Sequence, residues 1–224
     1  MPFNAKSREL FDFAYSKSSP DFYSPAEDSY LFLDTLEAEL DPILCRLSNP
    51  LIVEVGPGSG VLCGFLSRSL KDRQHETRVL AVDVNPAATD ATVKTFACVS
   101  RHTGVDALLG DATTSLIRSG TVDIILCNPP YVPSERDEFN HPLVAAWAGG
   151  LPDGREVTDR VIEQASKLLT VNGIMLLLLD ERNVPAAVCA FALTFGLKGR
   201  MLSKRKVPGE ILSVWLFERI PIWL

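Results

Sequence analysis

The sequence predicts an α/β fold with a seven-stranded, mostly parallel sheet, helices on both faces and a reversed hairpin at the C-terminal end. Three observations predict it. Five short apolar runs alternate with segments of helical length, which is typical of βαβ units. A glycine-rich turn follows the first of these runs. Near the end of the chain, Pro208-Gly209 separates two strand-like segments, which indicates a hairpin.

Each predicted element follows from a local pattern. The apolar runs at 51–55, 79–83, 105–109, 122–127 and 174–179 have the length of buried strands. The intervening segments predict helices at 61–71, 86–101 and 157–169, and a further helix is expected at 184–195. Antiparallel strands are expected at 198–206 and 211–218.

The front of the chain predicts another helix. Ser24 suits a helix cap, Pro25 suits the first helical position, and Glu27 can close a capping box. The amphipathic helix that follows would run through Leu31, Leu33, Leu36 and Leu40. Residues 23–224 are therefore expected to form one domain, preceded by a separate segment, 1–22. Leu10, Phe11 and Phe13 either pack on the core or leave that segment mobile until a substrate binds.

Composition restricts the function. A net charge of −6 and a pI of about 5.1 argue against a protein that binds nucleic acid alone. No apolar run is long enough for a membrane span, and the N-terminus does not resemble a secretory signal. Five cysteines without a C-x-x-C pair indicate free thiols in a reducing compartment, the cytoplasm or also the nucleus.

Three scattered histidines predict no metal site. The basic cluster at 204–206 favours a solvated hairpin tip over a substrate contact.

A glycine-rich loop directly follows the first predicted strand. Glu54 lies next to the last residue of that strand, and Gly56, Gly58 and Gly60 follow with G-x-G-x-G spacing. Glycines let a backbone turn sharply and approach a ligand closely. Because any tight βα turn can use glycines, the loop alone indicates a ligand site only weakly.

Acidic residues stand at the end of the next predicted strand and shortly after the end of the one that follows it. Asp83, followed by Val84, stands where a carboxylate accepts hydrogen bonds from both hydroxyls of a ribose. Asp111, followed by Ala112, is placed to meet an adenine amino group. A lone Asp at a strand end is usually a helix cap. Since the carboxyl ends of parallel strands share one edge of a sheet, the three elements together predict a nucleoside site.

The most specific motif is Asn128-Pro129-Pro130-Tyr131, at the end of the fourth predicted strand. An Asn side-chain carbonyl beside the backbone carbonyl of Pro129 can accept both hydrogens of a planar –NH2 group. The ring of Tyr131 would cover the flat face of that group. A rigid turn is the alternative interpretation, because Asn-Pro and Pro-Pro are loop formers. Beside a cofactor loop, the motif favours alkylation of a planar nitrogen.

These residues resemble the class I S-adenosylmethionine-dependent methyltransferases, whose fold is Rossmann-like. Within them the chain is similar to the eukaryotic and archaeal HemK-type glutamine methyltransferases from about Tyr23 to Phe217. The residues that carry this similarity are Tyr23-x-Pro-Ala-Glu-Asp28, Asn128-Pro-Pro-Tyr-Val132, Ala145-Ala-Trp-Ala-Gly-Gly150 and Asp153-Gly-Arg-Glu-Val-x-Asp-Arg160. Pro57 departs from the small residue common in the family, and Ser29 stands where Thr is common.

The resemblance implies an activity, a cofactor and partners. S-adenosylmethionine would be held by the glycine loop and the strand-end acids, together with Tyr23, Asp28, Ser29 and Asn128. The substrate would be the glutamine of a Gly-Gly-Gln loop in the class 1 translation termination factor. A small zinc-binding activator subunit would pair with the edge strand through Val105, Ala107, Leu108 and Leu109. An exposed apolar edge strand promotes aggregation unless something covers it. The alternative to an activator subunit is that a loop or the N-terminal segment of this chain covers the edge.

Three other functions stay open at this point. Adenine in DNA is one alternative acceptor, although the acidic pI disfavours it. A histone lysine is another, but the Asn-Pro-Pro-Tyr motif supplies no base to deprotonate an ammonium group. A non-catalytic S-adenosylmethionine-binding scaffold is an alternative of a different class. The intact glycine loop, Asp83, Asp111 and Asn128 argue against the scaffold.

Overall fold

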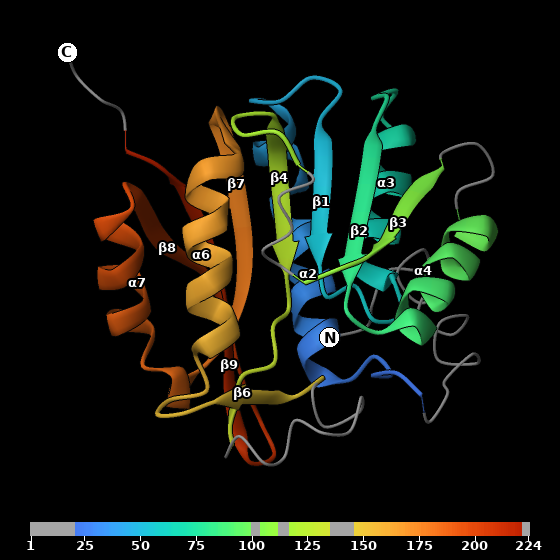
Figure 1. Ribbon diagram of the computed structural model, residues 1–224. Coiled ribbons are helices and arrows are strands. Elements are labelled where there is room, and N and C mark those ends of the chain that lie inside the picture. Colours follow the sequence, from blue (N-terminus) through green and yellow to red (C-terminus); the bar gives the residue numbers. More distant parts are fainter. Residues whose placement is uncertain (1–20, 100–103, 112–116, 135–145, 221–224) are drawn as a thin grey trace.

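The computed structural model describes residues 21–99, 104–111, 117–134 and 146–220, and its main feature is a seven-stranded sheet of order β3-β2-β1-β4-β7-β9-β8 (Figure 1). The strands are β1 (Leu51–Val55), β2 (Arg78–Asp83), β3 (Val105–Leu109), β4 (Val122–Cys127), β7 (Leu169–Asp180), β8 (Leu197–Val207) and β9 (Glu210–Arg219). The first five pair in parallel, and β9 runs antiparallel to both β7 and β8. The predicted sheet and its reversed hairpin are confirmed.

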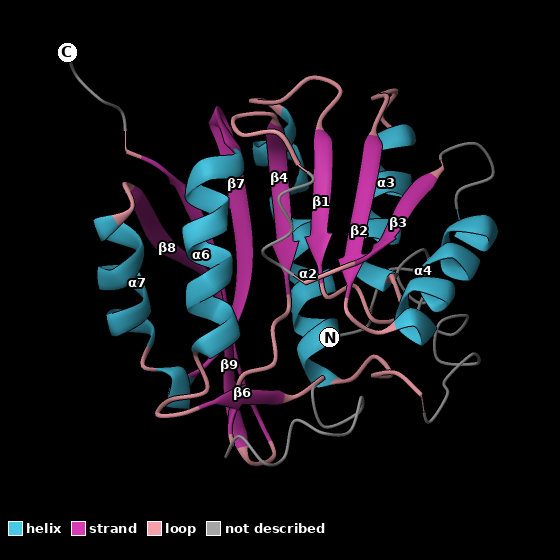
Figure 2. Ribbon diagram, in the orientation of Figure 1, coloured by secondary structure: helices cyan, strands magenta, loops and turns pink. Residues whose placement is uncertain are grey.

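Helices cover both faces of this sheet (Figure 2). The described helices are α2 (Glu27–Leu44), α3 (Val61–Lys71), α4 (Pro86–Val99), α6 (Glu156–Leu168) and α7 (Pro185–Thr194). In Figure 1, α6 and α7 lie in front of the sheet, and α2 and α3 lie behind it. None of the described helices is long and apolar enough to cross a membrane.

Among the described residues, a large hydrophobic core lies on each face of the sheet, because side chains alternate along each strand. On β4, Ile124 and Leu126 belong to the core beneath α2 and α3. Their neighbours Ile125 and Cys127 belong to the core beneath α6 and α7. All four are at most 2% exposed. Burial on both faces explains why the central strands are continuous apolar runs in the sequence.

The predicted start of the first helix is wrong. The N-cap of α2 is Ala26, which makes no side-chain capping hydrogen bond, and the helix begins at Glu27. Ser24 and Pro25 precede it as irregular chain, and Pro25 lines the cleft described below. Because Ser24 lies two residues before the N-cap, it cannot cap the helix, and the capping box expected between Ser24 and Glu27 does not form.

Strand β7 begins earlier than its apolar run indicates. Leu169 already pairs with Val122 of β4, five residues before the predicted start at 174. The exposed Val171 and the polar residues beside it hide this extension in the sequence. Since the strand takes Leu169, helix α6 ends at Leu168.

A second, two-stranded sheet pairs β5 (Val132–Pro133) with β6 (Ala148–Gly150). It had no counterpart among the predicted elements, because strands of two and three residues leave no periodic pattern. In Figure 1, β6 lies at the lower edge of the view, below the ends of the parallel strands. The predictions for Leu10, Phe11 and Phe13 lie outside the described residues.

Candidate active site

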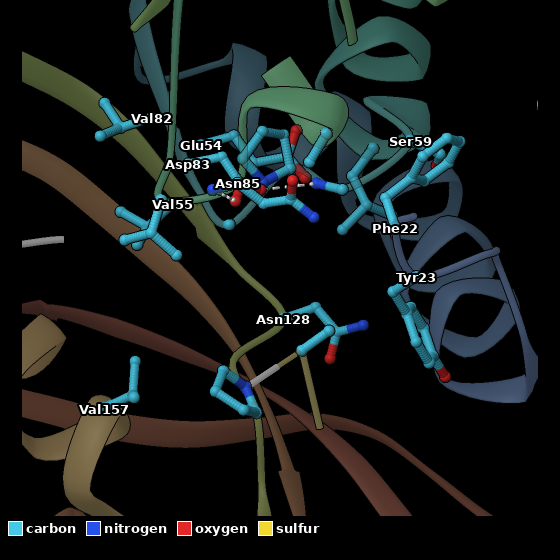
Figure 3. A pocket seen from close by; sticks show the side chains of 18 of the residues that line it. Phe22, Tyr23, Glu54, Val55, Ser59, Val82, Asp83, Asn85, Asn128 and Val157 are labelled. Atoms are coloured by element: carbon cyan, nitrogen blue, oxygen red, sulfur yellow. Dashed lines mark hydrogen bonds between the residues drawn. The ribbon is translucent and has the colours of Figure 1, made fainter. Parts of the chain in front are cut away.

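An open cleft lies at the carboxyl edge of the parallel strands and encloses about 1080 Å³, including its solvent-filled mouth. Its walls come from α2, α6 and the loops after β1, β2, β3 and β4. The structure brings most of the predicted site residues together in this wall: Tyr23, Asp28, Ser29, Glu54, Gly56, Gly58, Asp83, Val84, Asp111, Asn128 and Pro130. Figure 3 shows Asn128 across the cleft from Glu54 and Asp83.

The glycine loop has a left-handed backbone at each of its three glycines. Gly56, Gly58 and Gly60 have φ angles of 66°, 54° and 74°. Gly60 does not line the cleft; a Cβ atom there would lie 2.8 Å from the Cα of Thr92. Its missing side chain therefore serves the close packing of α3 against α4.

Glu54 lies beneath this loop and is only 1% exposed. Its Oε2 accepts a hydrogen bond of 2.9 Å from the backbone N–H of Cys63, in the first turn of α3. Burial raises the pKa of Glu54 to about 7, and the hydrogen bonds from Cys63 oppose this rise. Near neutral pH the cleft therefore contains a buried carboxyl group that is poised between its charged and neutral forms.

Asp83 joins two loops of the cleft. Its Oδ2 accepts from the backbone N–H of Gly58 at 3.2 Å, and its Oδ1 accepts from that of Asn85 at 2.9 Å. Burial raises the pKa of Asp83, and backbone N–H groups oppose this. The carboxylate is thus fixed at the end of β2, where a ribose would present its hydroxyls.

Asp111 receives a charged partner from the opposite wall. The Nη1 of Arg160 on α6 donates to its Oδ2 at 2.8 Å, and both side chains are about half exposed. A carboxylate accepts several hydrogen bonds, so this ion pair is compatible with the predicted contact to an adenine amino group. The neighbouring Val84 is 62% exposed at the same rim. Ala112, the other predicted contact, lies outside the described residues.

Asn128 has one satisfied and one unsatisfied end. Its Nδ2 donates to Oδ2 of Asp28 at 2.8 Å, whereas its Oδ1 is buried and has no hydrogen-bond partner among the described residues. Asp28 is 3% exposed, and its Oδ1 accepts from the backbone N–H and hydroxyl of Ser29 at 2.6 and 3.3 Å. Buried polar atoms are rarely left without a partner. The free carbonyl oxygen therefore marks a position where a donor is expected.

The two tyrosines that were predicted for the site, Tyr23 and Tyr131, have different surroundings. Tyr23 lines the cleft, and burial, followed by the charge of Asp28, raises its pKa. Tyr131 is 8% exposed and packs in the core beneath α2 and α3 rather than in the cleft wall. Its hydroxyl donates to Oε2 of Glu210 at 3.1 Å. The predicted cover of a planar amide by Tyr131 stays a prediction, as does acceptance by the Pro129 carbonyl.

Some residues of the wall were not among the predicted site residues. Phe22 packs on Ala88, and both line the cleft. No sequence signal marked them, because neither carries a polar group and neither belongs to a recognised motif. Asn85 could have been found from its place two residues after Asp83. Arg160 stands at the end of the recognised stretch that begins at Asp153, but its pairing with Asp111 depends on the fold.

Comparison with known proteins identifies the family. The family model described as Methyltransferase small domain matches residues 27–188. The chain is 35% identical over 202 residues to Methyltransferase HEMK2 of Mus musculus, covering 89% of this chain and 90% of the relative. It is 30% identical over 218 residues to the eRF1 methyltransferase catalytic subunit mtq2 of Schizosaccharomyces pombe, covering 92% and 94%.

A solved structure supports the same family assignment. The E. cuniculi Mtq2–Trm112 complex, described as methylating the eRF1 translation termination factor, includes a similar chain with a TM-score of 0.64 and 28% identity; the match covers 89% of this chain and 99% of that one. The resemblance to HemK-type enzymes is therefore confirmed. The chain belongs to the methyltransferase small domain family, in the branch that contains HEMK2 and mtq2.

Proposed function

We propose that this chain transfers a methyl group from S-adenosylmethionine to the side-chain amide of a glutamine in the Gly-Gly-Gln loop of a translation termination factor. It acts as the catalytic subunit of a heterodimer with a small zinc-binding activator. The relatives support the substrate and the assembly: mtq2 is named an eRF1 methyltransferase catalytic subunit, and the similar solved structure is a complex with Trm112.

The cleft fits the methyl donor. S-adenosylmethionine supplies a methyl group on a positively charged sulfur, and the wall offers four carboxyl groups: Asp28, Glu54, Asp83 and Asp111. The left-handed Gly56 and Gly58 let the backbone approach the donor closely. Asp83 is fixed by two backbone N–H groups and would accept from the ribose hydroxyls.

The observation that carries the proposal is the unpartnered Oδ1 of Asn128. Because Asp28 holds the Nδ2 end, the amide cannot rotate without losing its 2.8 Å hydrogen bond. Oδ1 therefore remains available as an acceptor. An amide –NH2 that donates one hydrogen to Oδ1 and the other to the Pro129 carbonyl would satisfy this buried oxygen.

These two acceptors would also activate the nitrogen. An amide nitrogen is a poor nucleophile since its lone pair is delocalised into the carbonyl. Held by both hydrogens, it would be oriented toward the methyl group, and the two oxygens would stabilise the positive charge that develops on it. The proton becomes acidic only after methylation and can leave to water. No strong base is needed, and among the described residues that line the cleft there is no His or Lys.

The activator would bind at the free side of β3. Among the described strands, β3 pairs only with β2, and Leu109 at its end is 61% exposed. A short apolar edge strand is suited to pair with a strand from another chain. This placement follows the predicted edge contacts Val105, Ala107, Leu108 and Leu109.

The test is mass spectrometry of the acceptor. The chain is co-expressed with its activator, and the complex is incubated with S-adenosylmethionine and the termination factor. We expect one methyl group on the Gly-Gly-Gln glutamine, and none with Asn128→Ala, which should still bind the donor. An unmethylated factor in a complex that binds the donor would contradict the proposal. Parallel assays on a histone and on DNA would then identify an acceptor among the alternatives.

A further inference from the structure

A short turn after β7 contacts the active-site motif from outside the cleft. It is the 3-10 helix η2 (Glu181–Asn183), and Asn183 at its end is fully buried. The Oδ1 of Asn183 accepts from the backbone N–H of Asp180 at 2.8 Å. Its Nδ2 donates to the carbonyls of Tyr131 and Asp153, each at 2.7 Å. Both ends of this amide are thus occupied by backbone groups.

The carbonyls that Asn183 joins come from two segments in direct contact. One segment is Tyr131, the last residue of the Asn-Pro-Pro-Tyr motif, and the other is the turn at Asp153 and Gly154. A Cβ atom on Gly154 would lie 2.2 Å from the carbonyl oxygen of Tyr131, so the two backbones touch. Without the Asn183 amide, the buried carbonyl of Tyr131 and the partly buried carbonyl of Asp153 would each lose a hydrogen bond, which costs free energy.

The same turn also holds the other end of Tyr131. The hydroxyl of Tyr131 donates to Glu210, and Nη2 of Arg182 donates to the second oxygen of Glu210 at 2.9 Å. Arg182 in turn donates to the buried carboxylate of Asp180, which also accepts from the backbone N–H of Ile211 at 3.1 Å. Tyr131 is therefore fixed at its carbonyl and at its hydroxyl by residues of one turn and one hairpin.

This anchoring reaches the proposed acceptors through a stiff segment. Pro129 and Pro130 have fixed φ angles, and each residue that precedes a proline is restricted in ψ. Cys127, at the other end, is held in the sheet by pairing with Val55 and Leu177. The carbonyl of Pro129 lies between two fixed ends, so its position depends on both.

We propose that Asn183 is a positioning residue for methyl transfer: it fixes the Tyr131 carbonyl and thereby the acceptor oxygens of Asn128 and Pro129. Asn183 does not line the cleft and acts only through the motif. The inference rests on the proposed function, because the effect on kcat is measured with the proposed methyl acceptor. The geometry of the motif can be tested without any methyl acceptor.

The main test variant is Asn183→Asp. It keeps the size of the side chain and the acceptor for Asp180, but places oxygen in front of the two carbonyls that now receive N–H groups. We expect kcat to fall by about 10- to 100-fold, as for the loss of alignment at a catalytic acceptor. The dissociation constant for S-adenosylmethionine, measured by calorimetry, should change by less than about threefold. Asn183→Ala is the second variant, in case the aspartate prevents folding.

The matched control is Thr35→Val. Thr35 is 4% exposed on α2, and its hydroxyl donates to the Leu31 carbonyl at 2.7 Å. This variant loses that buried hydrogen bond and the 2.5 Å contact with the hydroxyl of Ser203, but Thr35 does not touch the motif. Its kcat should equal that of the wild type at temperatures well below unfolding.

Hydrogen–deuterium exchange measures the geometry directly. Between residues 129 and 134 only Tyr131, Val132 and Ser134 have backbone N–H groups, because the others are prolines. The N–H of Val132 donates to the Trp147 carbonyl at 2.9 Å. We expect exchange at Val132 to be about tenfold faster in both Asn183 variants and unchanged in Thr35→Val.

Two results would overturn the inference. One is unchanged exchange at Val132 together with unchanged kcat. The other is a fall in kcat that Thr35→Val reproduces, or that a matching loss of donor affinity explains. If the wild-type complex fails to methylate the termination factor, the proposed function fails instead. The exchange rate of Val132 then decides the inference alone: faster exchange supports it, and unchanged exchange overturns it.

Discussion

Asn128 and Asp28 are 100 residues apart in the chain, yet Nδ2 of Asn128 lies 2.8 Å from Oδ2 of Asp28. This contact joins the end of β4 to the first turn of α2 across the cleft wall. It leaves Oδ1 of Asn128 buried and without a partner among the described residues. The orientation of the Asn128 amide is thus set by Asp28, a residue that was expected only to bind the cofactor.

Replacing Asp28 tests this orientation. Asp28→Asn keeps the side-chain volume, but the new amide can present either its oxygen or its –NH2 group to Asn128. If it presents the –NH2 group, that group can donate to Oδ1 of Asn128 and occupy the acceptor meant for the substrate. We expect kcat to fall by about 10- to 100-fold. Asp34→Asn, on the same helix and paired with Arg205 near the surface, is the control and should retain full activity.

The two roles of Asp28 separate in the kinetics. A fall in kcat with an unchanged dissociation constant for the donor indicates that Asp28 orients Asn128. A weaker donor affinity with normal turnover at saturation would show instead that its main role is the predicted cofactor contact.

Asp83 should control donor affinity. Asp83→Ala removes the carboxylate that joins Gly58 to Asn85 and would meet the ribose. Loss of charged hydrogen bonds of this kind typically weakens binding by about 10- to 100-fold. Calorimetry with S-adenosylmethionine measures the change, and Asp90→Ala on the exposed face of α4 is the control. Equal affinities for Asp83→Ala and the wild type would exclude the ribose contact.

The raised pKa of Glu54 should make the stability of the folded protein depend on pH. Its pKa rises from 4.5 to about 7 on folding, because burial disfavours the charged form. Its contribution to the free energy of unfolding is therefore fully present below pH 4.5 and is lost as the pH rises through 7. Glu54→Gln removes this dependence. Between pH 5 and pH 8, the wild type should lose on the order of 2 to 3 kcal/mol relative to the variant.

Denaturant unfolding without the donor measures that difference. Asp83, whose pKa is also raised by burial, remains in both proteins, so its effect cancels in the comparison. Parallel pH profiles for the wild type and Glu54→Gln would mean that Glu54 stays charged in the folded protein.

Leu109 tests the predicted partner edge. Leu109→Asp places a charge at the exposed end of β3 without changing a buried residue. We expect the co-expressed activator no longer to co-purify, while the thermal unfolding of the isolated chain stays within a few degrees. Val93→Asp, at an exposed position on α4, is the control. A stable heterodimer with Leu109→Asp would place the interface elsewhere.

The sheet could be predicted because strands such as β1 and β4 are buried on both faces and therefore appear in the sequence as apolar runs. The start of β7 could not, since Val171 is exposed and its neighbours are polar. Strands β5 and β6 are too short for any periodic signal. The glycine loop and Asn-Pro-Pro-Tyr could be located because their chemistry is local.

Contacts between distant side chains were not predictable in the same way. The sequence predicts that Asn128 and Asp28 share a site, but not that one orients the other. Tyr131 illustrates the same limit: its hydroxyl donates to Glu210, which arrives from the start of β9. Neither partner can be read from spacing, because both depend on how helices and hairpin pack against the sheet.

The central claim is that Asn128 and Pro129 accept both hydrogens of the substrate amide. Its most direct test is a crystal structure of the heterodimer with S-adenosylhomocysteine and a peptide that contains Gly-Gly-Gln. We expect the glutamine nitrogen to lie within hydrogen-bond distance, about 3 Å, of both Oδ1 of Asn128 and the Pro129 carbonyl. A glutamine amide bound elsewhere, with Oδ1 of Asn128 still unpartnered, would contradict it.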